Sequence, residues 1–157
     1  MTGVQTCALP ISLDYDRRVL ALTEAAAITR PTDPRLLRIR VWVLMAMADT
    51  YRLHWRSLKV KPSETLVWLE RALEVQERLR AVEPFNQQNL RDWIALEHRA
   101  SSGSLSAERF EDAARHGSRA IEASEAFRRL APGMTQGDLL LGISHIRRAK
   151  EIGRAHV

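Results

Sequence analysis

The stretch that decides the fold is TLVWLERALEVQERLRAVEP, residues 65–84. Apolar residues recur in it at every third or fourth position, namely at Trp68, Ala72, Val75, Leu79 and Val82. This spacing places them on one face of an α-helix. Pro84 follows directly, and a proline cannot continue a helix. The stretch therefore predicts an amphipathic helix that ends just before Pro84.

The rest of the chain repeats this pattern, and no stretch alternates apolar and polar residues as a half-buried strand does. Two further apolar faces consist of Tyr15, Val19, Leu22 and Ala26, and of Phe110, Ala113, Gly117, Ala120, Phe127 and Leu130. We therefore expect an all-α fold with about six helices, near residues 14–30, 35–57, 64–82, 87–100, 107–130 and 135–150. Short connections between them predict antiparallel neighbours.

Local signals predict where these helices begin. Asp33 before Pro34 is typical of an N-cap followed by a proline in the first turn, where no backbone N–H is needed. The segment Ser101-Ser-Gly-Ser104 is typical of a loop. Ser106 would then cap the helix that follows this loop.

The chain also contains an internal repeat. Pro34, Pro84 and Pro132 are 50 and 48 residues apart. After each proline, a large apolar residue, a very small residue and a ring recur at one spacing, in the sets Met47-Ala48-Tyr51, Ile94-Ala95-His98 and Leu141-Gly142-His145. Physically, the small residue would let a neighbouring helix approach closely, and the ring would fill the space beside it.

At this point the chain resembles the tetratricopeptide family of helix–turn–helix repeats. Leu44, Met47, Ala48 and Tyr51 fit the spacing of that family's first helix, W-x2-L-G-x2-Y. The run from Phe110 to Ala120 follows its second helix, with Gly117 at an aromatic position. The family repeats every 34 residues, whereas this chain repeats every 47 to 50, as do long-period relatives in regulatory tails of bacterial signalling proteins. The resemblance implies helix hairpins stacked as a short right-handed solenoid.

The two ends of the chain have a different interpretation. Residues 151–157 can be encoded by DNA whose reverse complement encodes residues 6–11 in frame, and the shared sequence resembles a sequencing-library adapter. We therefore expect residues 1–12 and 151–157 to be adapter-derived and not biological. Residues 13–150 would be an open-ended fragment of a larger protein, with about two full hairpins and a half repeat at each end. Both end helices are then expected to fray.

Composition limits the possible classes of protein. The single cysteine, Cys7, lies in the segment interpreted as adapter, so no disulfide or thiolate metal site is expected. The apolar run Val41–Ala48 is too short to span a membrane. With no targeting segment visible, a cytoplasmic location is expected. Lys and Arg number 24 against 19 Asp and Glu, which leaves a net positive charge of 5.

No pattern in the sequence points to an enzyme, a metal or a cofactor. The histidines His54, His98, His116 and His145 lack the spacing of a zinc site, so packing is preferred to a metal role. Ser144 and His145 are adjacent on a helix and point apart. The segment Gly133–Gly137 precedes a helix but lacks a lysine, so a plain turn is preferred to a phosphate loop. We predict no catalytic residues.

Two residue classes leave alternatives open. The tryptophans Trp42, Trp55, Trp68 and Trp93 fit helix packing, or a platform on which bases stack. The basic groups are Arg35, Arg38 and Arg40, then Arg52, Arg56, Lys59 and Lys61, then Arg147, Arg148 and Lys150. They would be solvated helix faces, or a stripe for nucleic acid or another polyanion.

The preferred function is a non-catalytic protein-interaction module. The resemblance implies that first helices line a concave groove for a peptide or a partner helix. By repeat position, Asp49 and Arg52 from one unit and Asp92 and Arg99 from the next would face that groove, where their charges select the partner. One alternative is a regulatory or spacer segment of a kinase, cyclase or transcription regulator. The other is a basic domain that binds polyanions such as nucleic acid.

Overall fold

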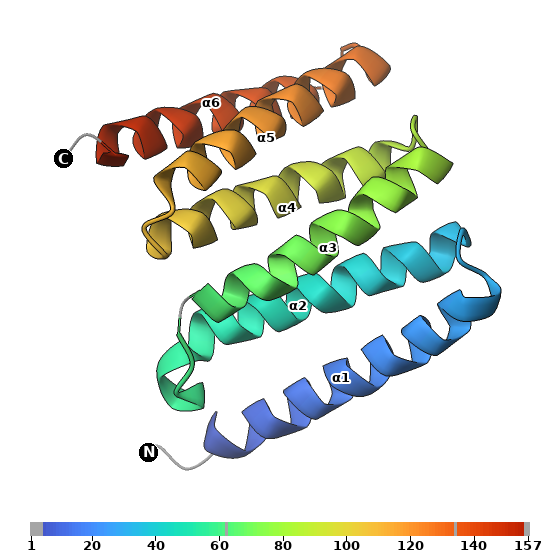
Figure 1. Ribbon diagram of the computed structural model, residues 1–157. Coiled ribbons are helices and arrows are strands. Elements are labelled where there is room, and N and C mark those ends of the chain that lie inside the picture. Colours follow the sequence, from blue (N-terminus) through green and yellow to red (C-terminus); the bar gives the residue numbers. More distant parts are fainter. Residues whose placement is uncertain (1–4, 62, 134, 156–157) are drawn as a thin grey trace.

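The computed structural model describes residues 5–155, except residues 62 and 134. Its helices are α1 (Gln5–Thr29), α2 (Pro34–Leu58), α3 (Ser63–Val82), α4 (Gln87–Ser106), α5 (Phe110–Leu130) and α6 (Thr135–Ala155). Within the described residues there is no strand, which confirms the predicted all-α fold with six helices. Figure 1 shows the helices stacked in chain order, each antiparallel to the next. No helix of this part of the chain combines the length and apolarity that crossing a membrane requires.

Local capping explains where two of the helices begin. The carboxylate of Asp33 accepts hydrogen bonds from the backbone N–H groups of Arg35 at 2.9 Å and Leu36 at 3.4 Å. The predicted N-cap at Asp33 is therefore confirmed, and Pro34 is the first residue of α2. Asn86 caps α4 in the same way, because its side-chain oxygen accepts from the N–H groups of Gln88 and Asn89. Such caps satisfy backbone donors that a helix start leaves without partners.

The predicted loop at Ser101–Ser104 is wrong, because these residues continue α4 to Ser106. Their small size serves helix packing instead of chain reversal. A Cβ added to Gly103 would lie 2.9 Å from Cδ2 of Leu66, so α3 and α4 approach closely at this point. The hydroxyl of Ser101 donates to the carbonyl of Ala113 on α5 at 3.0 Å. Small residues therefore mark the place where α4 fits between its two neighbours.

The predicted N-cap at Ser106 is also wrong. Ser106 lies in the last turn of α4, where its hydroxyl donates to the carbonyl of Ser102 at 3.0 Å. The residue before α5 is Arg109, whose side chain makes no capping hydrogen bond. The turn instead uses a positive φ of 60° at Glu108.

One continuous hydrophobic core joins α1 to α5. Its buried members are Leu20, Leu37, Val41, Leu44, Met47, Ala48, Leu66, Leu69, Ala72, Leu73, Val75, Leu79, Leu90, Trp93, Ile94, Leu96, Ala100, Ala123 and Phe127, with Leu140 of α6 packed against them. The helical spacing of the stretch 65–84 thus correctly predicted that Ala72, Val75 and Leu79 are buried. Burial of this apolar surface is the main force that holds the helices together.

The predicted apolar face of α1 is wrong. Tyr15 and Leu22 are 66% and 71% exposed, whereas Leu13, Leu20 and Thr23 are buried. The buried face is thus rotated relative to the prediction. Among the described helices, only α2 has Cα atoms within 8 Å of those of α1. One side of α1 is covered and the other is open.

The three repeated sets of residues do not have equal surroundings. Met47, Ala48 and Tyr51 are buried, and so are Ile94 and His98. In the third set Gly142 and His145 are exposed, which corrects the expectation that all three sets lie in helix contacts. A Cβ at Gly142 would have no described atom within 4 Å, because no helix of the described chain packs against that side of α6. Ser144 faces inward instead, and it is 1% exposed.

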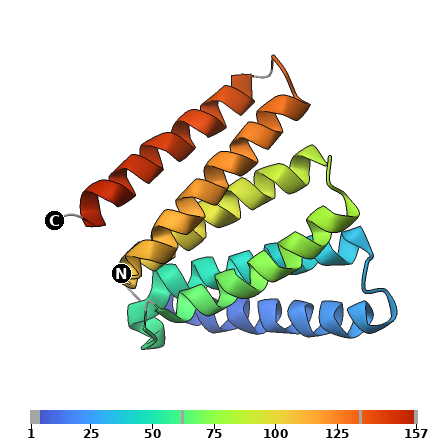
Figure 2. The same cartoon turned by 45° about the horizontal axis from the view of Figure 1, so that its top comes forward.

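The even-numbered helices approach one another more closely than the odd-numbered ones. Cα atoms of α2 and α4 lie within 8 Å, and so do those of α4 and α6. In the described chain no such approach joins α1 to α3 or α3 to α5. Long side chains connect those pairs, as Arg71 of α3 does with Glu24 of α1 at 2.8 Å, and Arg109 before α5 with Glu70 of α3 at 3.2 Å. Figure 2 shows α1 and α6 at the two ends of the stack.

Candidate functional site

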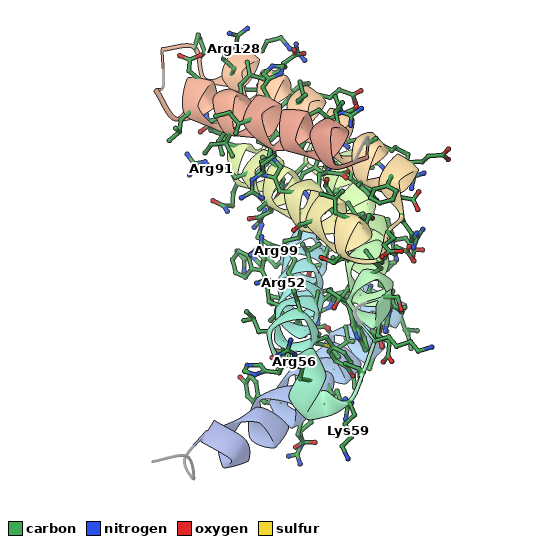
Figure 3. All side chains as sticks on the ribbon, turned by 90° about the vertical axis from the view of Figure 1, so that its left-hand side faces the viewer. Arg52, Arg56, Lys59, Arg91, Arg99 and Arg128 are labelled. Carbon is green, nitrogen blue, oxygen red and sulfur yellow. The ribbon has the colours of Figure 1, made fainter. Side chains whose placement is uncertain are left out.

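Three of the four residues predicted to face a groove meet where α2 passes α4. The carboxylate of Asp49 on α2 accepts a hydrogen bond from Nε of Arg99 on α4 at 3.1 Å. Arg52, one turn further along α2, reaches the same carboxylate at 3.4 Å. Figure 3 shows Arg52 and Arg99 close together on one side of the molecule. The two arginines therefore share one carboxylate.

These residues line a pocket of about 440 Å³ between α2, α4 and α6. Its walls consist of Asp49, Arg52, Ala95, His98, Arg99, Ser102 and Arg147. Ala95 and Ser102 have the short side chains that leave space between the longer ones. The pocket thus takes residues from three helices that are far apart in the sequence, and it opens on the side where the even-numbered helices meet.

The charge of the pocket is positive. Arg52, Arg99 and Arg147 contribute three guanidinium groups, and Asp49 contributes the only carboxylate among the lining residues. Arg147 has no acidic group within 4 Å among the described residues, whereas Asp49 is divided between two arginines. Guanidinium groups bind carboxylates and phosphates through paired N–H donors. The pocket is therefore suited to an anion.

Histidine 98 is an uncharged wall of this pocket at neutral pH. The pKa of His98 is lowered from 6.5 to about 4, first by burial and then by the positive charges of Arg147 and Arg99. Its Nε2 lies 3.0 Å from the hydroxyl of Ser144 on α6, and that hydroxyl lies 3.0 Å from the hydroxyl of Ser124 on α5. Because Ser144 is buried, this contact joins three helices and offers no open nucleophile.

Asp92, the fourth predicted residue, lies outside the pocket. It is only 8% exposed, and its carboxylate accepts hydrogen bonds from Nε1 of Trp42 at 3.1 Å and from Gln88 at 2.9 Å. Asp92 therefore fixes the indole of Trp42 between α2 and α4. The structure brings Asp49, Arg52 and Arg99 together and gives Asp92 a positioning role beside them.

An apolar strip adjoins the pocket on α2. Ile39, Trp42 and Ala46 are exposed and follow one another at helical spacing, and Asp49 comes next on the same face. Trp42 keeps 48% of its surface exposed although its indole N–H is bonded. An exposed aromatic ring held in a fixed orientation is a typical contact for a partner side chain. We call Ile39, Trp42, Ala46 and the pocket together the groove.

The basic groups identified in the sequence have different surroundings. Arg38 is bound to Glu83 at 2.6 Å and to Asn89, so this cation serves the contact between α2, α4 and the turn after α3. Burial, opposed by the charge of Glu24, lowers the pKa of Arg40. Other basic residues lie along one side of the molecule in Figure 3, namely Arg128, Arg91, Arg99, Arg52, Arg56 and Lys59. The groove lies within this basic side.

A buried carboxylate elsewhere has a structural role. Glu97 on α4 is fully buried and accepts hydrogen bonds from Trp93 at 2.8 Å, His116 at 2.7 Å and Arg119 at 3.1 Å. Charges are found in protein interiors only when they are paired in this way. Glu97 and His116 therefore join α4 to α5.

The sequence did not identify His98, Ala95, Ser102 or Arg147 as members of the site. His98 and Ala95 were singled out as packing residues of the repeat, and Arg147 as one of several basic residues. These residues line one pocket only because α4 and α6 pack side by side. A local sequence pattern does not predict how far apart two such helices lie. Ser102 was assigned to a loop, so its place on the exposed side of α4 was not foreseen.

Comparisons with known proteins give no relative for the chain: no protein-family model matches it, and neither do curated proteins or solved structures.

Proposed function

We propose that this chain is a non-catalytic protein-interaction module built from tetratricopeptide-like hairpins. In this proposal α2–α3 and α4–α5 are two complete units, and α6 is the first helix of a third. The sequence repeat of 47 to 50 residues supports it. So do the contacts between equivalent helices, because Trp42 binds Asp92 and Asp49 binds Arg99 at a separation of 50 residues.

The observation that carries the proposal is the difference between the two sides of the stack. The even-numbered helices approach one another at the backbone level, whereas the odd-numbered ones are linked through long side chains. When the helices on one side of a stack lie closer together than those on the other side, the stack curves toward the closer helices, which here are the even-numbered ones. The pocket and the exposed Trp42 lie on the even-numbered helices, which form the inner side in this proposal. A concave surface with a pocket and an exposed aromatic ring supports binding of a peptide or a partner helix.

A display selection with random peptides tests this proposal. Peptides selected on the wild-type protein are measured again on Ala46→Arg, which places a long charged side chain on the exposed strip of the groove. Ala81→Arg is the matched control, because Ala81 is also an exposed alanine in a helix, on α3. We expect Ala46→Arg to weaken the selected peptides about ten-fold or more, as loss of a central contact does, and Ala81→Arg to leave them unchanged. Equal effects of the two substitutions, or a selection without binders, contradict the proposal.

A further inference from the structure

We infer that the groove selects an acidic peptide segment, with one carboxylate in the pocket and one large apolar side chain on Trp42, about 10 Å away along α2. This inference rests on the proposed function and adds the chemistry of the partner to it.

The carboxylate follows from the balance of charge in the pocket. Three guanidinium groups face one carboxylate, and Asp49 is already divided between Arg52 and Arg99. Arg147, from α6, has no acidic partner within 4 Å among the described residues, and its positive charge helps to lower the pKa of the neighbouring His98. An anion between Arg99 and Arg147 would satisfy both. The short side chains of Ala95 and Ser102 leave room for it.

The apolar side chain follows from the strip beside the pocket. Trp42 is held by Asp92 and presents the rest of its ring to solvent next to Ile39. Trp42 precedes Asp49 by two helical turns, which corresponds to about 10 Å along the helix axis. A peptide in the polyproline II conformation advances about 3.1 Å per residue and places every third side chain on the same face. A partner in this conformation therefore carries its apolar side chain and its carboxylate three positions apart.

The same face argues against a nucleic acid as the partner. A nucleic acid strand places a phosphate at every nucleotide, whereas the strip beside the pocket consists of Ile39, Trp42 and Ala46 and carries no cation. A peptide with a single acidic group fits this arrangement, because its other positions are neutral. The exposed apolar residues Ile39 and Ala46 offer nothing to a phosphate chain, whereas they suit an aliphatic or aromatic side chain.

The test uses fluorescein-labelled peptides of ten residues in a serine–glycine background, and fluorescence anisotropy as the measurement. The probe carries one tryptophan and one glutamate three positions apart, in both orders. Comparison peptides replace the glutamate by glutamine, replace the tryptophan by serine, or separate the two by six positions. We expect one order of the probe to bind about ten-fold or more tightly than each of its three comparison peptides.

Variants of the protein locate the effect. Arg147→Gln is expected to reduce binding of the glutamate probe toward that of the glutamine peptide and to leave the glutamine peptide unchanged. Arg129→Gln is the matched control, because Arg129 is an exposed arginine of α5 outside the groove.

NMR titration of His98 gives an independent readout. An anion in the pocket offsets the positive charges of Arg99 and Arg147, so the glutamate probe should raise the pKa of His98 and the glutamine peptide should not. Asp49, Arg52 and Glu97 are the other charged groups near His98, and their effect on its pKa is the same in the titrations with the two peptides.

The outcomes separate this inference from the proposed function. If glutamate and glutamine peptides bind equally and Ala46→Arg still abolishes binding, the acidic preference is wrong while the groove remains. If the peptide with the six-position separation binds as well as the probe, the inferred contact between the apolar side chain and Trp42 is wrong. If ten-residue oligothymidylate displaces the probe and binding falls steeply with salt, the partner is a polyanion instead. If no peptide binds, both proposals fail.

Discussion

The uncharged state of His98 makes the stability of the protein depend on pH. In the unfolded chain this imidazole takes up a proton near pH 6.5, whereas in the folded protein its pKa is about 4. Between these values the unfolded state binds more protons than the folded state. The free energy of unfolding therefore falls as the pH is lowered from about 6.5 to 4.

This pH effect is testable with the variant His98→Gln, which cannot titrate in this range. The contribution of His98 to the loss of stability is expected to be on the order of 1–3 kcal/mol. Urea unfolding at pH 7 and pH 4.5 gives the free energies for the wild type and the variant. The wild type should lose more stability than the variant on acidification. Equal losses would show that His98 does not resist protonation.

Glu97 is the side chain whose removal should be most damaging. Replacement by alanine leaves Trp93 and His116 without their acceptor and takes one of two carboxylates from Arg119. Removing one partner of a buried charge pair costs about 3–5 kcal/mol. Glu74→Ala is the control, because Glu74 is exposed on α3 and should change stability by less than about 0.5 kcal/mol. Thermal unfolding of both variants measures the difference, and a similar effect of the two would contradict the role of Glu97.

Two glycines in the middle of helices have opposite roles in helix packing. Gly103 lies where α4 meets Leu66 of α3, whereas a side chain at Gly142 of α6 would point into open space. Gly103→Leu is expected to cost about 1–3 kcal/mol or more, because the core is overpacked. Gly142→Leu should stabilise by about 0.5–1 kcal/mol, because leucine favours the helix over glycine. Chemical denaturation of the pair checks both signs, and destabilisation by Gly142→Leu would show that this face is covered.

The helices that the sequence predicted well are those with strong local signals. Asp33 caps α2 as predicted, and the spacing in residues 65–84 places Ala72 and Leu79 in the core. The segment Ser101–Ser104 was misassigned because small polar residues suit both a loop and a tight helix contact. Only the position of Leu66 distinguishes these two, and Leu66 is distant in sequence.

The candidate site was predictable in part for a similar reason. Asp49, Arg52 and Arg99 follow from repeat position, since one unit places equivalent residues on the same side. Asp92 follows the same rule but is drawn inward by Trp42. Arg147 joins the pocket only because α6 packs beside α4, a contact that the sequence pattern alone does not fix.

The protection of the backbone should vary from the middle of the stack to its ends. α3 packs between α2 and α4, whereas α1 has only α2 beside it. Local opening is easiest where few buried contacts must be broken. We therefore expect amides of α1 and α6 to exchange faster with solvent deuterium than those of α3. Hydrogen exchange measured by mass spectrometry, at peptide resolution, checks this order. Equal protection of the three helices would contradict the view that the end helices lack support.

The open sides of α1 and α6 also have a consequence for behaviour at high concentration. α1 exposes Tyr15, Leu22 and Ile28, and α6 exposes Leu139 and Ile146. We expect the apolar surface of α1 on one molecule to pack against that of α6 on another. A contact between two different surfaces leaves one of each surface free in a dimer, so further molecules can be added. Sedimentation velocity at rising concentration should therefore show a ladder of trimers and longer chains instead of a plateau at the dimer. Leu22→Glu or Ile146→Glu alone should stop this growth, because each contact between two molecules needs the apolar surface of α1 from one and the apolar surface of α6 from the other.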